Sequence, residues 1–219
     1  MARYRMLLGT VVLTAALAAP LEAQRGRVQD WQNRWYWGIK GGMTTYSLPT
    51  AGNVVTPSFG VDWLITQRRA ALYVSYSRTF QTEQDTFAIA GLAGTNNGVT
   101  FDGLQKIAIG INAMVGNGQL QPYLGGGFAL HILSNAQSTT PSPAAGVVTA
   151  IEDAASGAFL FLVAGAQYRF GTKGAIFASW QYSPLGSDYM LQGGSHSLEA
   201  GIRYAFLNAR DEGRGSRSN

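Results

Sequence analysis

The stretch Lys106–Ala113, with the sequence KIAIGINA, alternates large apolar residues with small or polar ones at every second position. Ile107, Ile109 and Ile111 occupy one set of positions, and Lys106 and Asn112 belong to the other. Because successive side chains of a β-strand point to opposite faces, this stretch predicts a strand with one apolar face and one polar face.

The same alternation recurs along the chain and predicts eight strands. Segments of about ten residues are longer than the usual globular strand of roughly 5–6 residues, and they match tilted strands that cross a bilayer. Apolar-out, polar-in alternation over such segments is typical of transmembrane β-barrels. The expected strands are 35–46, 57–66, 70–81, 100–115, 120–132, 157–170, 175–184 and 196–206.

The connections between these segments alternate strictly between short and long. The short ones are 67–69, 116–119, which contains the hairpin dipeptide Asn117-Gly118, and 171–174. The long ones are 47–56, 82–99, 133–156 and 185–195. This order places all short turns at one end of an up-and-down barrel and all long loops at the other, as in outer-membrane barrels.

The composition agrees with a membrane barrel and excludes several kinds of site. Only 13% of the 219 residues are charged although 46% are hydrophobic, and Gly occurs 28 times; soluble domains carry about 25% charged residues. The chain has no Cys and 2 His, so we expect no disulfide, no metal site and no cofactor.

The first 23 residues have the features of a cleavable signal peptide. Arg3 and Arg5 precede the apolar stretch Met6–Ala19, and Ala23 is a small residue before the expected cut. The apolar stretch is too short for a membrane anchor. We therefore expect a signal peptide over 1–23, a barrel over 24–206 and a polar tail over 207–219.

Charge is divided between the two kinds of connection. The short turns carry Arg68, Arg69 and Lys173 and no acid. The net charge of +4 forms no basic stripe, so nucleic acid is not an expected partner. We expect an acidic external face, at which extracellular ligands would bind, because the long loops contain no base and hold Glu83, Asp85, Glu152, Asp153 and Asp188.

If the apolar face of each strand contacts lipid, the polar face carries charged residues into the barrel. The interior of an eight-stranded barrel is just wide enough to be filled by side chains, and charges there must pair. We expect a lumen network of ion pairs; a narrow polar path for ions or small solutes is the alternative. The predicted network comprises Lys40, Asp62, Asp102, Lys106, Arg169, Glu199 and Arg203.

Aromatic residues gather near the ends of the expected strands, where amphipathic rings can lie between headgroups and acyl chains. We expect these side chains to form an interfacial girdle. They are Trp35, Tyr36, Trp37, Tyr168, Phe170, Tyr204 and Phe206.

The last strand, 199–206 with the sequence EAGIRYAF, resembles the C-terminal β-signal of outer-membrane proteins. The matching positions are Glu199, Gly201, Tyr204 and Phe206, although 13 residues follow Phe206 here. The resemblance implies that the barrel-assembly machinery is a partner.

Two further segments resemble the OmpA/OmpX-like outer-membrane β-barrel family. They are 121–127, QPYLGGG, and 164–170, AGAQYRF. The resemblance implies an all-β, eight-stranded antiparallel up-and-down transmembrane barrel in the outer membrane, with outer-membrane lipid as its surroundings.

For function, we expect a non-enzymatic barrel with a structural or surface-interaction role, and no catalytic residue is assigned. A narrow-conductance pore and a soluble barrel of lipocalin type are alternatives. A lipid A-modifying barrel hydrolase is another, because 131–135, HILSN, is faintly similar to an element of barrel deacylases. The spacing of His131 and Ser134 puts them on opposite faces of a strand, and Glu199 would have to lie beside them.

Overall fold

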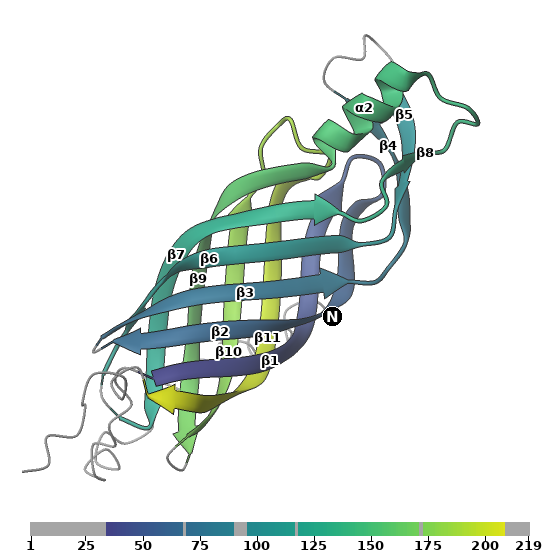
Figure 1. The fold of residues 1–219 in the computed structure, drawn as a ribbon. Helices are drawn as coiled ribbons and strands as arrows, with labels where there is room; N and C mark the ends of the chain where they lie inside the picture. Colours follow the sequence, from purple (N-terminus) through teal and green to yellow (C-terminus); the bar gives the residue numbers. More distant parts are fainter. Residues whose placement is uncertain (1–33, 68, 90–95, 117, 171–172, 209–219) are drawn as a thin grey trace, which may run out of the picture.

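The computed structural model describes residues 34–67, 69–89, 96–116, 118–170 and 173–208. Within these ranges the chain forms a closed antiparallel barrel in the strand order β1-β11-β10-β9-β7-β6-β3-β2 (Figure 1). The signal peptide expected over 1–23 lies outside the described residues, as does the tail after Asn208. The barrel strands are β1 (Arg34–Leu48), β2 (Gly52–Gln67), β3 (Ala70–Thr79), β6 (Leu104–Met114), β7 (Leu120–Leu133), β9 (Ser156–Phe170), β10 (Gly174–Pro184) and β11 (Gln192–Asn208).

The eight-stranded antiparallel barrel predicted from the alternation is confirmed. Strands that follow one another around the barrel pair antiparallel, and β11 closes the barrel by pairing with β1 through partners such as Gly38 and Arg203. Burial alternates residue by residue, as in β6, where Lys106 is buried and Ile107 is exposed. The period-2 pattern of the sequence therefore follows directly from which face each side chain occupies.

The connections β2–β3, β6–β7 and β9–β10 lie together at one end of the barrel, the turn end (Figure 1). The first of the expected long loops, 47–56, is different from the prediction: β1 runs to Leu48 and β2 begins at Gly52, so only 49–51 connect them. The two strands continue as a hairpin because Tyr46 and Leu48 pack into an apolar cluster at the end of the barrel.

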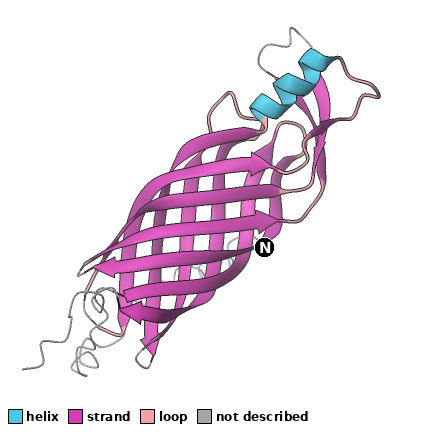
Figure 2. Ribbon diagram, viewed as in Figure 1, coloured by secondary structure: helices cyan, strands magenta, loops and turns pink. Residues whose placement is uncertain are grey.

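At the opposite end, the remaining connections build a layer of secondary structure, which we call the cap. It consists of β4 (Glu83–Ala88), β5 (Asn96–Phe101), β8 (Gln137–Ser138), the helix α2 (Ala145–Ala154) and residues 185–191. β4, β5 and β8 form a separate sheet, and α2 lies beside it (Figure 2). Among the described residues, no helix has both the length and the apolarity needed to cross a membrane.

Two apolar clusters fill the molecule. One lies in the cap and includes Phe87, Phe101, Ile151 and Leu191, each at most 1% exposed. The other lies inside the barrel and includes Leu64, Tyr73, Tyr123 and Phe161. The barrel interior is consequently packed with side chains, as expected for eight strands.

Candidate functional site

The outer surface of the barrel is an apolar belt. Ile39, Ile109, Leu124 and Ile202 are between 54% and 68% exposed and come from different strands. An apolar patch of this extent would be unusual on a soluble monomer. The polar face points inward and the apolar face outward, which is the arrangement of a transmembrane barrel.

Aromatic side chains line both margins of this belt. At the turn end, the ring centroids of Trp37 and Trp63 are 5.5 Å apart and stacked, and those of Tyr204 and Phe206 are 5.0 Å apart. Tyr168 and Phe170 are also exposed there. Toward the cap, His196 lies 4.8 Å from the ring of Tyr182.

Tyr36 does not belong to the girdle in which it was predicted. Its side chain is 2% exposed and lies in the interior cluster. Trp35 and Trp37 occupy the outward positions of β1, so the residue between them must face inward.

Asp62 and Arg203 form an ion pair inside the barrel, with Arg203 Nη2 donating to Asp62 Oδ2 at 2.6 Å. Arg203 Nη1 also donates to Gln167 Oε1 at 3.2 Å, and the guanidinium lies 3.7 Å from the centroid of the Phe177 ring. Both partners are 1% exposed. The charge of Arg203 is thus neutralised by a carboxylate and covered by an aromatic face.

Lys40 and Glu199 form a second interior ion pair. Lys40 Nζ donates to Glu199 Oε2 at 2.7 Å and to the Tyr73 hydroxyl at 3.4 Å. The lysine comes from β1, the glutamate from β11 and the tyrosine from β3. These contacts link three strands through the lumen.

Lys106 of β6 reaches across the barrel toward the opposite wall. Its Nζ donates to Ser197 Oγ of β11 at 2.7 Å, and these two strands stand opposite each other in the closed strand order. Ser197 Oγ is also 3.2 Å from Thr44 Oγ1. The side chains of Lys106 and Ser197 therefore block the lumen at this level.

Six of the seven residues predicted for the lumen network face the interior, and Asp102 does not. Arg169 is buried at the turn end. Asp102 lies between β5 and β6, where Thr82 Oγ1 and Asn135 Nδ2 donate to its carboxylate at 3.0 and 2.9 Å. Gly103 adopts φ +103° and interrupts the strand there, so the alternation of β6 does not extend to residue 102.

Several polar members of the interior could not be identified from charge patterns. Ser197, Gln167 and Tyr73 all contact the charged residues, yet each is an uncharged residue at an ordinary inward position. The alternation alone is the signal that could have located them, because it predicts which residues face inward.

His131 lies where the barrel interior meets the cap. It is 0% exposed, and its ring centroid is 5.5 Å from that of Phe159 and 6.4 Å from that of Tyr189. Ser134 accepts a hydrogen bond from Gln105 Nε2 at 2.8 Å. Among the described residues His131 has no hydrogen-bond partner, so no His–Ser or His–Glu pair of a hydrolase is formed.

The cap closes the end of the barrel away from the turns. Tyr46 and Leu48 of β1, Leu104 of β6 and Leu133 of β7 enter the same buried cluster as the cap residues. Apolar packing therefore continues from the barrel wall across the mouth of the lumen.

The cap is acidic throughout the part of it that the structure describes. Glu152, Asp153 and Asp188 are exposed, and the described cap residues include no Lys or Arg. Asp85 is buried and accepts hydrogen bonds from the backbone N–H groups of Thr50 and Thr86 at 2.9 and 2.7 Å. Burial raises the pKa of the Asp85 carboxyl, but these hydrogen bonds outweigh that effect and the pKa lies below its usual value.

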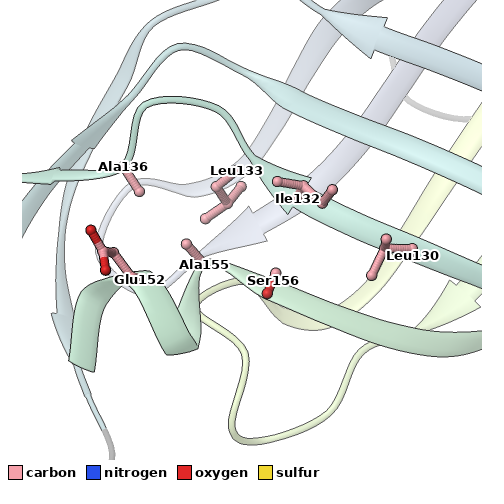
Figure 3. Close-up of a pocket in the computed structure, with 7 residues that line it drawn as sticks. All are labelled: Leu130, Ile132, Leu133, Ala136, Glu152, Ala155 and Ser156. Carbon is pink, nitrogen blue, oxygen red and sulfur yellow. The ribbon is translucent and has the colours of Figure 1, made fainter. Parts of the chain in front are cut away.

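A pocket of about 390 Å³ lies under α2, where β7 and β9 leave the barrel (Figure 3). Leu130 and Ile132 line it from β7, and Glu152 borders it from the helix. Its walls are mostly apolar, and Leu130 connects it with the belt. No group of His, Cys, Asp or Glu suited to a metal ion occurs among the described residues.

The residues that resemble a β-signal occupy the strand that closes the barrel. Glu199 and Gly201 face inward, and Tyr204 and Phe206 face outward at the turn end. β11 runs to Asn208, two residues beyond Phe206.

Comparison with solved structures finds similar small barrels, of which Neisserial surface protein A shares the fold. Neisserial surface protein A is similar with a TM-score of 0.54 and 16% identity, covering 78% of this chain and 97% of that one. OprG from Pseudomonas aeruginosa has a TM-score of 0.49 and 10% identity, covering 80% and 97%. The N-terminal barrel of Pseudomonas aeruginosa OprF has a TM-score of 0.45 and 16% identity, covering 80% and 98%. No protein-family model and no curated protein matches the chain.

The identities are low, so the likeness concerns the fold. It agrees with what the belt, the polar interior and the closed strand order indicate independently. The chain is a small eight-stranded transmembrane β-barrel with the fold of Neisserial surface protein A.

Proposed function

We propose that this protein is a non-enzymatic barrel of the outer membrane, with a structural or surface-interaction role carried by its cap. The observation that carries the proposal is the obstruction of the lumen at several levels. Arg203 and Asp62 pair near the turn end, Lys106 spans the barrel to Ser197, and the cap cluster covers the opposite mouth.

These obstructions argue against a pore. Ion conduction needs a continuous polar path, whereas apolar packing seals the cap end and paired side chains cross the middle. The surroundings of His131 likewise argue against a hydrolase, since the ring packs between Phe159 and Tyr189 away from the lipid-facing surface.

The cap is the part best suited to interaction. By the usual orientation of such barrels, short turns face the periplasm and the larger connections face outward. The exposed carboxylates of Glu152, Asp153 and Asp188 would then meet extracellular ligands, and basic partners fit this charge. Assembly would proceed through recognition of β11 by the barrel-assembly machinery.

Planar-bilayer recording of the purified, folded protein tests the proposal. We expect no channel events, because the lumen is blocked at several levels. Discrete conductance steps from a folded sample would overturn it and favour the narrow pore. Envelope lipid A compared between the wild type and His131→Ala tests the hydrolase, and we expect no difference.

A further inference from the structure

A layer of polar side chains lies inside the barrel between the interior apolar cluster and the cap. On β6, Lys106 stands between Ala108 of the interior cluster and Leu104 of the cap cluster. Cross-strand pairing places Ser77 and His131 beside Lys106, and Thr44 and Gln181 beside Ser197 on the opposite wall. We call the following residues the polar layer: Thr44, Ser77, Lys106, His131, Gln181 and Ser197.

Two members of the polar layer have unmet hydrogen-bonding capacity. Gln181 is 2% exposed, and within the described part of the chain neither its Oε1 nor its Nε2 has a hydrogen-bond partner. The same holds for both ring nitrogens of His131. Buried polar groups in folded proteins are almost always satisfied, so a further group is expected to meet them here.

Lys106 adds a positive charge to this layer. Its ammonium group donates a hydrogen bond to the neutral hydroxyl of Ser197. The Glu199 carboxylate attracts Lys106 electrostatically, but its ion pair is with Lys40, and Asp62 pairs with Arg203. The described interior therefore holds more positive than negative charge, with four bases (Lys40, Lys106, Arg169, Arg203) against two acids (Asp62, Glu199).

The surroundings of the layer make this charge costly to leave uncompensated. Above it, Leu104 and Leu133 belong to the cap cluster; below it, Ala108 and Ala129 belong to the interior cluster on one wall, and the Lys40–Glu199 ion pair lies on the other. An ammonium group removed from water between two apolar clusters is strongly destabilising unless it meets an anion.

We infer that the polar layer binds a small monovalent inorganic anion of halide size. The Lys106 ammonium supplies the charge, while the Gln181 amide N–H and neighbouring hydroxyls supply donors. The bound anion compensates the charge of Lys106 and provides Gln181 Nε2 with an acceptor. Lys106 and Gln181 are 3% and 2% exposed, and this burial favours a small ion over a larger polyatomic one.

Unfolding of the refolded protein in bromide tests this inference. Bromide is compared with a bulky organic anion at equal ionic strength. Samples are heated to a series of temperatures, and gel electrophoresis gives the fraction of protein that still migrates as the folded barrel. We expect the midpoint to be higher in bromide by about 3–6 °C when bromide is at roughly ten times its dissociation constant. Equal midpoints in the two salts would overturn the inference and indicate that water satisfies the polar groups of the layer.

Two variants separate specific binding from a general salt effect. Lys106→Met should abolish the difference between the salts, whereas Lys173→Met, at an exposed turn position, should retain it. Persistence of the difference in Lys106→Met would contradict the assignment. If Lys106→Met fails to fold, anomalous scattering from wild-type crystals grown in bromide decides: a peak within hydrogen-bond distance of Lys106 Nζ supports the site, and none refutes it.

Discussion

Arg203 of β11 and Asp62 of β2 are both cross-strand neighbours of Gly38 in β1. Their side chains form an ion pair over Gly38, with 2.6 Å between Arg203 Nη2 and Asp62 Oδ2. A Cβ atom at position 38 would collide with Asp62 Oδ1 and meet Arg203 Cγ. Position 38 therefore needs glycine because two charged side chains from its two neighbouring strands occupy the space above it. This places an ion pair at the seam where the first and last strands close the barrel.

Gly38→Ala should destabilise the folded barrel, because the added methyl group displaces the carboxylate of Asp62. We expect a loss of about 1–3 kcal/mol, the usual cost of overpacking. Urea unfolding in detergent measures it. Gly41→Ala in the same strand is the matched control, since its Cβ would meet Phe59 at an ordinary 3.5 Å. Similar losses in both variants would show that the effect is not specific to the ion pair.

The ion pair itself can be examined by comparing a variant that removes one charge with a variant that removes both. Asp62→Asn leaves Arg203 without a carboxylate partner, so we expect a loss of about 3–5 kcal/mol. Combining Asp62→Leu with Arg203→Met removes both charges and should cost less than the single change. We attribute the stability lost in Asp62→Asn to the uncompensated charge of Arg203. A double variant that is less stable than Asp62→Asn would contradict this attribution.

The apolar belt can be tested with two exposed residues of similar character. Ile109 is 54% exposed on β6 within the belt, and Val148 is 40% exposed on α2 in the cap. Ile109→Arg should destabilise the membrane-inserted barrel by about 2–4 kcal/mol, since arginine is placed against lipid. Val148→Arg should change stability little. Refolding into lipid vesicles measures both, and equal tolerance would argue against a lipid-facing belt.

Asp85 should make the junction of the cap with the β1–β2 hairpin sensitive to acid. Its pKa in the folded protein is below the ordinary value of about 3.9, so its stabilising contribution is complete above that value. The contribution is lost as the pH falls below that value and through the folded pKa. Hydrogen exchange of the Thr50 and Ala51 amides, corrected for intrinsic rates, should accelerate over this acid range.

Asp85→Asn should remove most of that acid dependence and speed exchange at neutral pH. Asp153→Asn, at an exposed position of α2, serves as the control and should behave as the wild type. Acid-accelerated exchange that persists unchanged in Asp85→Asn would assign the effect to another group.

The sequence predicts the barrel well because a strand's two faces meet different solvents here. Lipid on one side and a packed polar interior on the other impose a period of two on residue polarity, as between Lys106 and Ile107. This period is visible in the sequence as alternating apolar and polar residues. The same rule places Lys40, Glu199 and Arg203 inward. It does not reveal which of them pair, because pairing depends on register between strands distant in sequence.

The cap could not be predicted in the same way. Its stability comes from contacts among segments far apart in the chain, such as Tyr46 with Phe101, rather than from a repeated pattern. The helix α2 is short, contains Val147, Val148 and Thr149, and starts without a side-chain cap, so its local signal is weak. It is held by burial of Ile151 and Ala154 in the cap cluster.

Asp102 shows how a single glycine can end the inward–outward alternation of side chains along a strand. The sequence around it continues the pattern of β6, but Gly103 adopts a left-handed backbone and changes the direction of the chain. A φ of this kind cannot be read from alternating hydrophobicity.

Cell fractionation followed by electrophoresis of unheated and heated samples tests the central claim most directly. We predict recovery in the outer membrane, extraction only with detergent, and a mobility that changes on heating, because a closed barrel with an apolar belt resists detergent until it is heated. Recovery in the soluble periplasm with the same mobility before and after heating would contradict the membrane assignment and favour a soluble barrel of lipocalin type.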